Sequence, residues 1–280
     1  MTGFNLINNL KLEYHRKVTS RFTKDDRPHP SPVTVMMPLA PKDLDRARIT
    51  LAALREQLVH PIARMVLIGP DDPRIQALAD ELGIEAMDET AALAPHMRPE
   101  TLASMRGYFR QQFLKLLGNR ILGAEFIVTM DADTRPIRPT AFIASDGRQI
   151  LYRGDRNSIP YNRFTEALIG PVPRGSDSFV AHCMLFRRAT IDALAAKIEA
   201  HTGQDWVEAT AALAARPIDQ VGAMSEFDLY AHFLLQTAPH AIEERYYSNI
   251  KVNPAQFTGE TPLPRWKTRF RFVSNHERGA

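Results

Sequence analysis

The chain has 280 residues, of which 44% are hydrophobic and 24% are charged, with one cysteine and a net charge of +3. This composition is typical of a globular protein, and the single Cys183 excludes an internal disulfide framework and a cysteine-rich zinc module. No run approaches the roughly 20 apolar residues of a membrane span, and the N-terminus lacks the apolar core of a secretory signal. We therefore expect a cytoplasmic protein.

Strand and helix patterns alternate over the first 130 residues, after an arm and linker over residues 1–32 that ends in a proline-rich stretch. Short apolar runs predict strands, and apolar residues three or four apart predict helices. In chain order, the predicted elements are a strand at 33–37, a helix at 42–58, a strand at 62–69, a helix at 74–82, a strand at 84–87, a helix at 99–122 and a strand at 125–130. This order predicts an α/β fold with a mostly parallel sheet between helices, in which ligands bind at the carboxyl ends of strands.

The pattern becomes looser and more helical beyond residue 133. We predict strands at 149–153 and 178–187, helices at 190–201, 205–215 and 225–236, and an extended end at 265–273. The predicted organisation is one domain over residues 33–260, followed by a basic tail over 261–280.

Positive charge is concentrated at the two ends, with a net +3 over residues 1–30, +4 over 261–280 and −4 between them. A basic tail suggests an anionic partner, which could be a nucleotide phosphate, a nucleic acid or an anionic membrane surface, although a solvated tail is equally consistent. In an extended tail, alternation puts one set of residues on one side and a second set against the core. The first set is Arg265, Lys267, Arg269 and Arg271, and the second is Trp266, Phe270 and Phe272.

The strongest chemical signal is Asp131-Ala132-Asp133, directly after the predicted strand at 125–130. Residues two apart in extended chain share one side, and two carboxylates held that close repel each other unless a cation lies between them. Oxygen ligands of this kind suit Mg²⁺ or Mn²⁺, which commonly bridge substrate phosphates. The alternatives are a surface turn with two solvated aspartates and a haloacid-dehalogenase phosphatase. The phosphatase motif normally lies on the first strand, and Arg135 departs from its pattern.

Five segments carry a resemblance to known proteins: Val33 to Pro38, Gly107 to Leu116, Met130 to Thr134, Ala181 to Phe186 and Ser225 to Tyr230. Through them the sequence resembles the GT-A class of nucleotide-sugar glycosyltransferases, and more narrowly a bacterial glycosyltransferase-like family long catalogued as a domain of unknown function. The resemblance implies a single GT-A domain, in which residues 33–135 bind a nucleotide sugar and residues 136–260 bind the acceptor. It also implies a Mn²⁺ or Mg²⁺ ion that neutralises the diphosphate leaving group.

Two parts of the chain are candidates for binding the donor nucleotide sugar. The first lies at the ends of the first two strands, where Met37, Pro38 and Leu39 would contact the base and Asp72 would accept a hydrogen bond from base or ribose. The second is one face of the helix at 99–122, since residues at i, i+4 and i+7 lie on one side. That face carries Tyr108, Gln112 and Lys115, with Gln111 beside it. Its alternative role is a solvated polar face.

Metal ligands and catalytic residues are expected in four places. Asp133 is the more direct metal ligand, and by analogy with the class Asp131 could also reach the ribose. His276, near the C-terminus, fits the position at which several GT-A enzymes complete the metal site, although a frayed chain end is the alternative. The remaining candidates, for catalysis, are Glu226, Asp228 and His182.

Glu226 and Asp228 have competing interpretations. In Ser225-Glu226-Phe227-Asp228, a serine followed three residues later by an acid is typical of a helix cap, which accounts for both acids structurally. The functional interpretation places Glu226 in the cleft, where it would bind an acceptor hydroxyl or remove its proton. His182 is the competing base, although a single histidine in an apolar strand is more often a core residue.

The predicted function is therefore a metal-dependent glycosyltransferase with a nucleoside-diphosphate sugar donor and a saccharide or glycolipid acceptor. Family analogy alone places it in bacterial surface polysaccharide or glycolipid assembly. The expected location is the cytoplasm, with the inner face of the membrane and peripheral membrane contact as options, and no nucleic-acid partner is expected. A nucleotidyltransferase is the enzymatic alternative, but the glycine-rich signature expected after the first strand is missing from residues 37–42. An inactive binding or scaffold protein is the non-enzymatic alternative.

Overall fold

The computed structural model describes residues 27, 29–154, 159–172, 178–259 and 264–275. The predicted N-terminal arm lies almost entirely outside these residues, as does His276. Within the described residues, no helix combines the length and apolarity that a membrane crossing requires.

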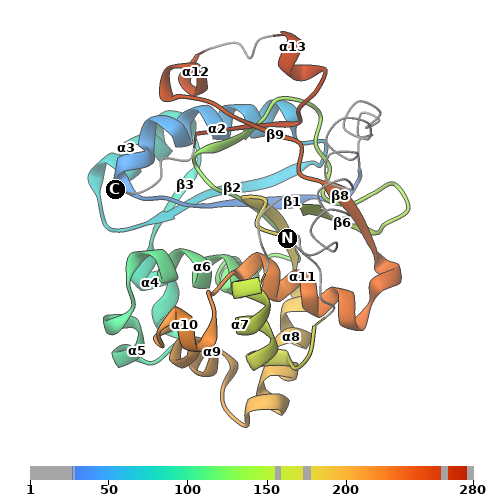
Figure 1. Ribbon diagram of the computed structural model, residues 1–280. Helices are drawn as coiled ribbons and strands as arrows, with labels where there is room; N and C mark the ends of the chain where they lie inside the picture. The colour runs from blue at the N-terminus through green and yellow to red at the C-terminus, as the bar shows by residue number, and fades with distance from the viewer. Residues whose placement is uncertain (1–26, 28, 155–158, 173–177, 260–263, 276–280) are drawn as a thin grey trace.

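A five-stranded sheet forms the centre of the molecule, with strand order β3-β2-β1-β4-β7 (Figure 1). The strands are β1 (Val33–Pro38), β2 (Ile62–Gly69), β3 (Glu85–Asp88), β4 (Phe126–Met130) and β7 (Cys183–Arg187). The first four are parallel, and β7 runs antiparallel to β4, so that Cys183 lies opposite Met130. The predicted α/β fold with a mostly parallel sheet is confirmed. Strand β7, which comes from the predicted acceptor half, joins this same sheet.

Helices cover both faces of the sheet, because central parallel strands are apolar on both sides. On one face lie α2 (Leu44–Gln57) and α3 (Pro73–Leu82), and the larger helical layer covers the other face (Figure 1). That layer consists of α4 (Glu89–Leu93), α5 (Pro99–Ser104), α6 (Gly107–Leu122), α7 (Ile159–Ile169), α8 (Arg188–Thr202), α9 (Trp206–Ala214), α10 (Ile218–Val221) and α11 (Glu226–Thr237). Each face has its own hydrophobic core, and Met36 and Met37 of β1 contribute to opposite cores.

Two small sheets are formed by strands that follow β4 in the chain. Strand β10 (Phe272–Ser274) lies between β5 (Thr134–Pro136) and β9 (Asn249–Lys251), and it pairs antiparallel with β5. Strands β6 (Gln149–Arg153) and β8 (Ile242–Tyr246) form a parallel pair. The short helices α12 (Pro254–Thr258) and α13 (Pro264–Lys267) lie between β9 and β10 in the chain.

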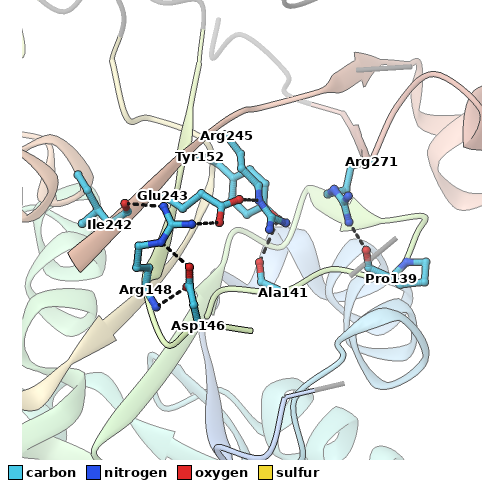
Figure 2. A network of polar contacts seen from close by, with 9 residues as sticks. All are labelled: Pro139, Ala141, Asp146, Arg148, Tyr152, Ile242, Glu243, Arg245 and Arg271. Atoms are coloured by element: carbon cyan, nitrogen blue, oxygen red, sulfur yellow. Dashed lines mark hydrogen bonds and ion pairs between the residues drawn. The ribbon is translucent and has the colours of Figure 1, made fainter. Parts of the chain in front are cut away.

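A polar network ties the loop before β6 to these sheets (Figure 2). Arg148 pairs with Asp146 at 2.7 Å and with Glu243 of β8 at 3.2 Å, and Arg245 pairs with the same Glu243 at 2.6 Å. Arg271 donates to the carbonyl oxygen of Pro139. The loop is therefore held at both ends by side chains from the C-terminal third of the chain.

Three predicted elements differ from the structure. The predicted helix at 99–122 is two helices, because Met105 and Arg106 have extended backbone and Gly107, a weak helix former, begins α6. Of the predicted strand at 178–187, only Cys183–Arg187 is a strand. The predicted extended tail begins instead with the helix α13, and Arg271, expected on the solvent side, is buried with 3% exposure.

Candidate functional site

A polar pocket opens where β4 ends against the first turns of α6 and α11. Helix α6 contributes one long row of side chains, Asp131 follows β4, and His182 precedes β7. The pocket is lined by Tyr108, Gln111, Gln112, Lys115, Asp131, Tyr161, Val180, His182, Ser225, Glu226 and Phe227. Seven residues predicted as donor, metal or catalytic groups therefore meet in one place, from segments far apart in the sequence.

Lys115 joins two carboxylates at the bottom of this pocket. Its Nζ lies 2.7 Å from Asp131 Oδ1 and 2.7 Å from Glu226 Oε1, while its side chain is only 7% exposed. The ammonium group also lies 4.5 Å from the centre of the Phe227 ring. Burial alone would lower the pKa of Lys115, but Asp131 and Glu226 together raise it above its ordinary value. Lys115 is therefore a permanently charged link between β4 and α11.

Asp131 has a second partner on its other oxygen. Its Oδ2 lies 2.9 Å from His182 Nδ1, and its backbone N–H donates to the His182 carbonyl oxygen at 2.9 Å. Burial acts to raise the pKa of Asp131, but Lys115 and His182 hold it well below its usual range. Asp131 is consequently an anion at neutral pH.

Asp131, Asp133 and His182 form a group that could hold a metal ion. One ligand atom from each lies within 4.8 Å of the others. A carboxylate oxygen has more than one lone pair, so the two hydrogen bonds to Asp131 leave it capacity to coordinate a cation. The two carboxylates suit Mn²⁺ or Mg²⁺, and the imidazole adds a nitrogen ligand of the kind that transition-metal ions accept more readily than Mg²⁺. The residues present therefore fit a divalent ion, and His182, predicted as a base, belongs to the ligand group.

The C-terminal segment ends beside this group. Strand β10 pairs with β5 so that Ser274 lies opposite Thr134, and the Asn275 N–H donates to the Asp133 carbonyl oxygen at 2.9 Å. Asn275 is the last described residue, and His276, predicted as a metal ligand, follows it outside the described residues. Its role stays a prediction.

Gln112 lies in the pocket with its amide group unsatisfied. The residue is 3% exposed, and neither Nε2 nor Oε1 has a hydrogen-bond partner among the described residues. An unsatisfied buried polar group costs about 1–3 kcal/mol, so such a group in a pocket points to a polar ligand. Tyr108, by contrast, is 64% exposed at the first turn of α6.

The residues predicted at the ends of β1 and β2 do not line this pocket. Met37 and Leu39 are fully buried, with 0% and 2% exposure, and Pro38 is buried between them. A Cβ on Gly69 would lie 2.4 Å from the Leu39 carbonyl oxygen, so only glycine allows the two strand ends to approach this closely. Asp72 caps α3, since it accepts from the Arg74 N–H at 2.9 Å and pairs with the Arg74 guanidinium at 2.6 Å.

Asp228 is not among the residues that line the pocket. The side chain is 0% exposed, and its carboxylate accepts from the Phe179 N–H and from the hydroxyls of Ser178 and Ser225 at 3.0–3.1 Å. The predicted cap is present, because Ser225 Oγ accepts from the Asp228 N–H. Glu226, two residues earlier, faces the pocket instead.

Sequence reasoning missed Tyr161 and Tyr247. Tyr161 lies on α7. The sequence could have predicted this helix, because Pro160 stands at its start and the apolar Phe164 and Leu168 are four residues apart. The ring of Tyr247 lies 6.2 Å from that of His182, and no spacing in the sequence relates the two residues.

Comparison with known proteins identifies the family. The family described as "Family of unknown function (DUF6492)" matches residues 32–268, and the chain belongs to it. No curated protein matches the sequence.

Similar solved structures include mouse xyloside xylosyltransferase 1 in its apo form, with a TM-score of 0.44 and 11% identity over 88% of this chain and 98% of that chain. The galactosyltransferase LgtC in complex with donor and acceptor sugar analogs has a TM-score of 0.44 and 13% identity, over 88% of this chain and 87% of that chain. Both likenesses are distant, so the function has to rest on the residues of the site.

Proposed function

We propose that this member of the DUF6492 family is a metal-dependent glycosyltransferase that moves a sugar from a nucleoside diphosphate to a saccharide or glycolipid acceptor. The observation that carries the proposal is that Asp131 and His182, two of the three possible metal ligands, also line a pocket. That pocket contains the buried ammonium group of Lys115 and the unsatisfied amide of Gln112. The resemblance of the sequence to GT-A glycosyltransferases supports the same assignment. By family analogy, the setting is bacterial surface polysaccharide assembly at the cytoplasmic side of the membrane.

Asp131, Asp133 and His182 are the proposed ligands of Mn²⁺ or Mg²⁺. When bound, the ion supplies positive charge that stabilises the departing diphosphate. His276 is a further proposed ligand, supported by the hydrogen bond that holds Asn275 against Asp133. The His182–Asp131 contact fixes the orientation of the imidazole, as a partner on the second ring nitrogen commonly does in metal sites.

Lys115 and Gln112 are the proposed donor-binding residues on α6. Lys115 lies beside Asp131 and can also donate a hydrogen bond to a diphosphate oxygen, because an ammonium group has three N–H donors. The unsatisfied amide of Gln112 can both donate to and accept from sugar hydroxyls. Donor binding by Met37, Pro38, Leu39, Asp72 and Gln111, and by Tyr108 at the pocket mouth, stays a prediction.

Glu226 is the proposed acceptor-binding residue. Its carboxylate faces the pocket, and Lys115 holds it through one oxygen at 2.7 Å. Glu226→Gln keeps the shape and the hydrogen-bonding oxygen, so we expect unchanged donor binding and transfer reduced by roughly 10²-fold. Isothermal titration with the donor and initial rates of transfer measure the two effects. Near-normal transfer by this variant would remove Glu226 from the reaction.

A panel of nucleotide sugars tests the function directly. We expect one donor to be hydrolysed slowly in the presence of Mn²⁺, and the matching nucleoside diphosphate to raise the melting temperature more with Mn²⁺ than with a chelator. A scaffold protein would show no metal-dependent shift with any nucleotide. Pyrophosphate-forming activity with nucleoside triphosphates would instead favour the nucleotidyltransferase.

A further inference from the structure

Asp228 connects two segments that carry pocket residues. It belongs to the first turn of α11, two residues after Glu226, and its Oδ1 accepts from the Phe179 N–H at 3.0 Å. Its Oδ2 accepts from the Ser178 hydroxyl at 3.1 Å and from the Ser225 hydroxyl at 3.0 Å. One buried carboxylate therefore fastens the segment 178–182 to the helix of Glu226.

Among the strands of the described residues, none includes the segment 178–182, since β7 begins at Cys183. The shape of this segment depends on Ser178, whose hydroxyl accepts from the Val180 N–H at 2.9 Å and whose carbonyl oxygen accepts from the Gly154 N–H at 2.8 Å. The segment delivers Val180 and His182 to the pocket. Asp228 holds it at the end opposite to His182.

His182 has the only positive φ of a residue other than glycine among the described residues, at 58°. A left-handed conformation is uncommon for a residue other than glycine, and it persists where the surrounding structure holds it. Here the imposed conformation turns Nδ1 to within 2.9 Å of Asp131 Oδ2. The hydrogen bonds on either side, from Asp131 to the His182 carbonyl oxygen and from the segment to Asp228, maintain it.

We propose that Asp228 is a positioning residue, which fixes the segment 178–182 so that His182 meets Asp131 and Asp133 beside Glu226. This inference rests on the proposed metal site. Asp228, predicted as a catalytic group, would then act on the reaction indirectly. Its carboxylate is fully buried and does not line the pocket, so it acts through the residues that it holds in place.

Two substitutions separate positioning from catalysis. Asp228→Asn keeps an oxygen for the Phe179 N–H, and its amide N–H groups can donate to the two serine hydroxyls, which also accept. Asp228→Ala removes all of these bonds. A positioning residue therefore tolerates asparagine and not alanine, whereas a group that needs its negative charge at the reacting atoms tolerates neither.

Mn²⁺ affinity of the full chain, measured by electron paramagnetic resonance titration without nucleotide, is the main readout. We expect Asp228→Asn to bind Mn²⁺ within about threefold of wild type and to retain transfer. We expect Asp228→Ala to weaken Mn²⁺ binding by about tenfold or more, as loss of outer partners does in metal sites. Ser178→Ala, which leaves the helix cap intact, should weaken binding in the same direction and serves if Asp228→Ala does not fold.

Leu234→Ala is the matched control. Leu234 is buried on the same helix at 6% exposure, so its truncation lowers stability and should leave Mn²⁺ affinity unchanged. Wild-type affinity in Asp228→Ala and Ser178→Ala would overturn the inference, as would loss of transfer in Asp228→Asn with Mn²⁺ binding intact. If wild type itself binds no Mn²⁺, the proposed metal site fails and this inference with it.

Discussion

The carboxyl end of β4 and the carboxyl ends of β1 and β2 lie at the same edge of one sheet, yet their chemistry differs. At β4, Lys115 and His182 each contact Asp131, and all three residues line a pocket. At β1 and β2, Leu39 is buried and the carboxylate of Asp72 is engaged by Arg74. A carboxylate at a strand end therefore lies at the ligand-binding edge of the sheet, but the side chains of other elements decide whether it is available to a ligand.

The largest effect is expected at β4. Replacing Asp131 and Asp133 together by asparagine removes both anionic ligands, so Mn²⁺ binding should be lost and transfer should fall by at least about 10³-fold. Mn²⁺ titration and transfer rates measure this. Asp146→Asn, which removes an exposed carboxylate paired with Arg148, is the control and should leave both unchanged. Metal-dependent transfer by the double variant would contradict the site.

Lys115 tests whether the buried ion pairs also stabilise the fold. Lys115→Met leaves the carboxylates of Asp131 and Glu226 without their shared cation, which should lower the free energy of unfolding by about 3–5 kcal/mol. Chemical denaturation measures this, and the double variant Lys115→Met/Glu226→Gln should recover part of the loss.

The matched control for Lys115 lies on the same helix. Arg120 pairs with Asp192 at the surface at 2.9 Å, with both side chains substantially exposed. Arg120→Met should change the free energy of unfolding by no more than about 1 kcal/mol. Equal losses at both positions would mean that Lys115 is an ordinary ion pair rather than a buried link.

The pH dependence of stability should reveal the buried carboxylate of Asp228. Burial raises its pKa to about 6, against the opposing hydrogen bonds from Phe179, Ser225 and Ser178. For an acid with a raised pKa, the stabilising contribution is complete below the unfolded pKa, near 4, and is lost as the pH rises through 6. Wild type should therefore lose about 3 kcal/mol relative to Asp228→Asn between pH 4 and pH 7.

His232 also titrates in this range, so the comparison with Asp228→Asn is needed. It lies 3.9 Å from Asp228, and burial and Arg153 lower its pKa to about 4. The charge of Glu226, on the same turn, acts with burial to raise the pKa of Asp228. His232 and Glu226 are present in both proteins, and their own contributions largely cancel in the difference. A difference that stays constant with pH would show that Asp228 does not titrate there.

Local patterns in the sequence were sufficient to predict the sheet and the position of the carboxylate pair. The strand at Ile62–Gly69 and the strand before Asp131 follow from apolar runs and have nearly the predicted bounds. The contacts of Lys115 with Glu226, 111 residues away, could not be predicted from spacing, because they depend on how α6 and α11 pack. The failed strand at 178–182 has the same cause, since hydrogen bonds of Ser178 and of Asp228, 50 residues further along the chain, shape this segment.

Asp72 provides the smallest expected effect and the sharpest comparison with Asp131, because both follow strands of the same sheet. Arg74, through its side chain and its backbone N–H, lowers the pKa of Asp72 to about 2, and the contact with the α3 N-terminus accounts for this carboxylate without any ligand. Asp72→Ala should therefore lower the melting temperature slightly through loss of the cap.

If Asp72 also binds the donor nucleotide, as its position after β2 predicts, the same variant should weaken nucleoside-diphosphate binding at least fivefold. Asp72→Ser separates the two roles, because serine retains a capping oxygen and loses the charge. Normal melting with weakened nucleotide binding in Asp72→Ser would extend the site from β4 across β1 to β2, whereas unchanged nucleotide binding in both variants would confine it to the pocket around Lys115.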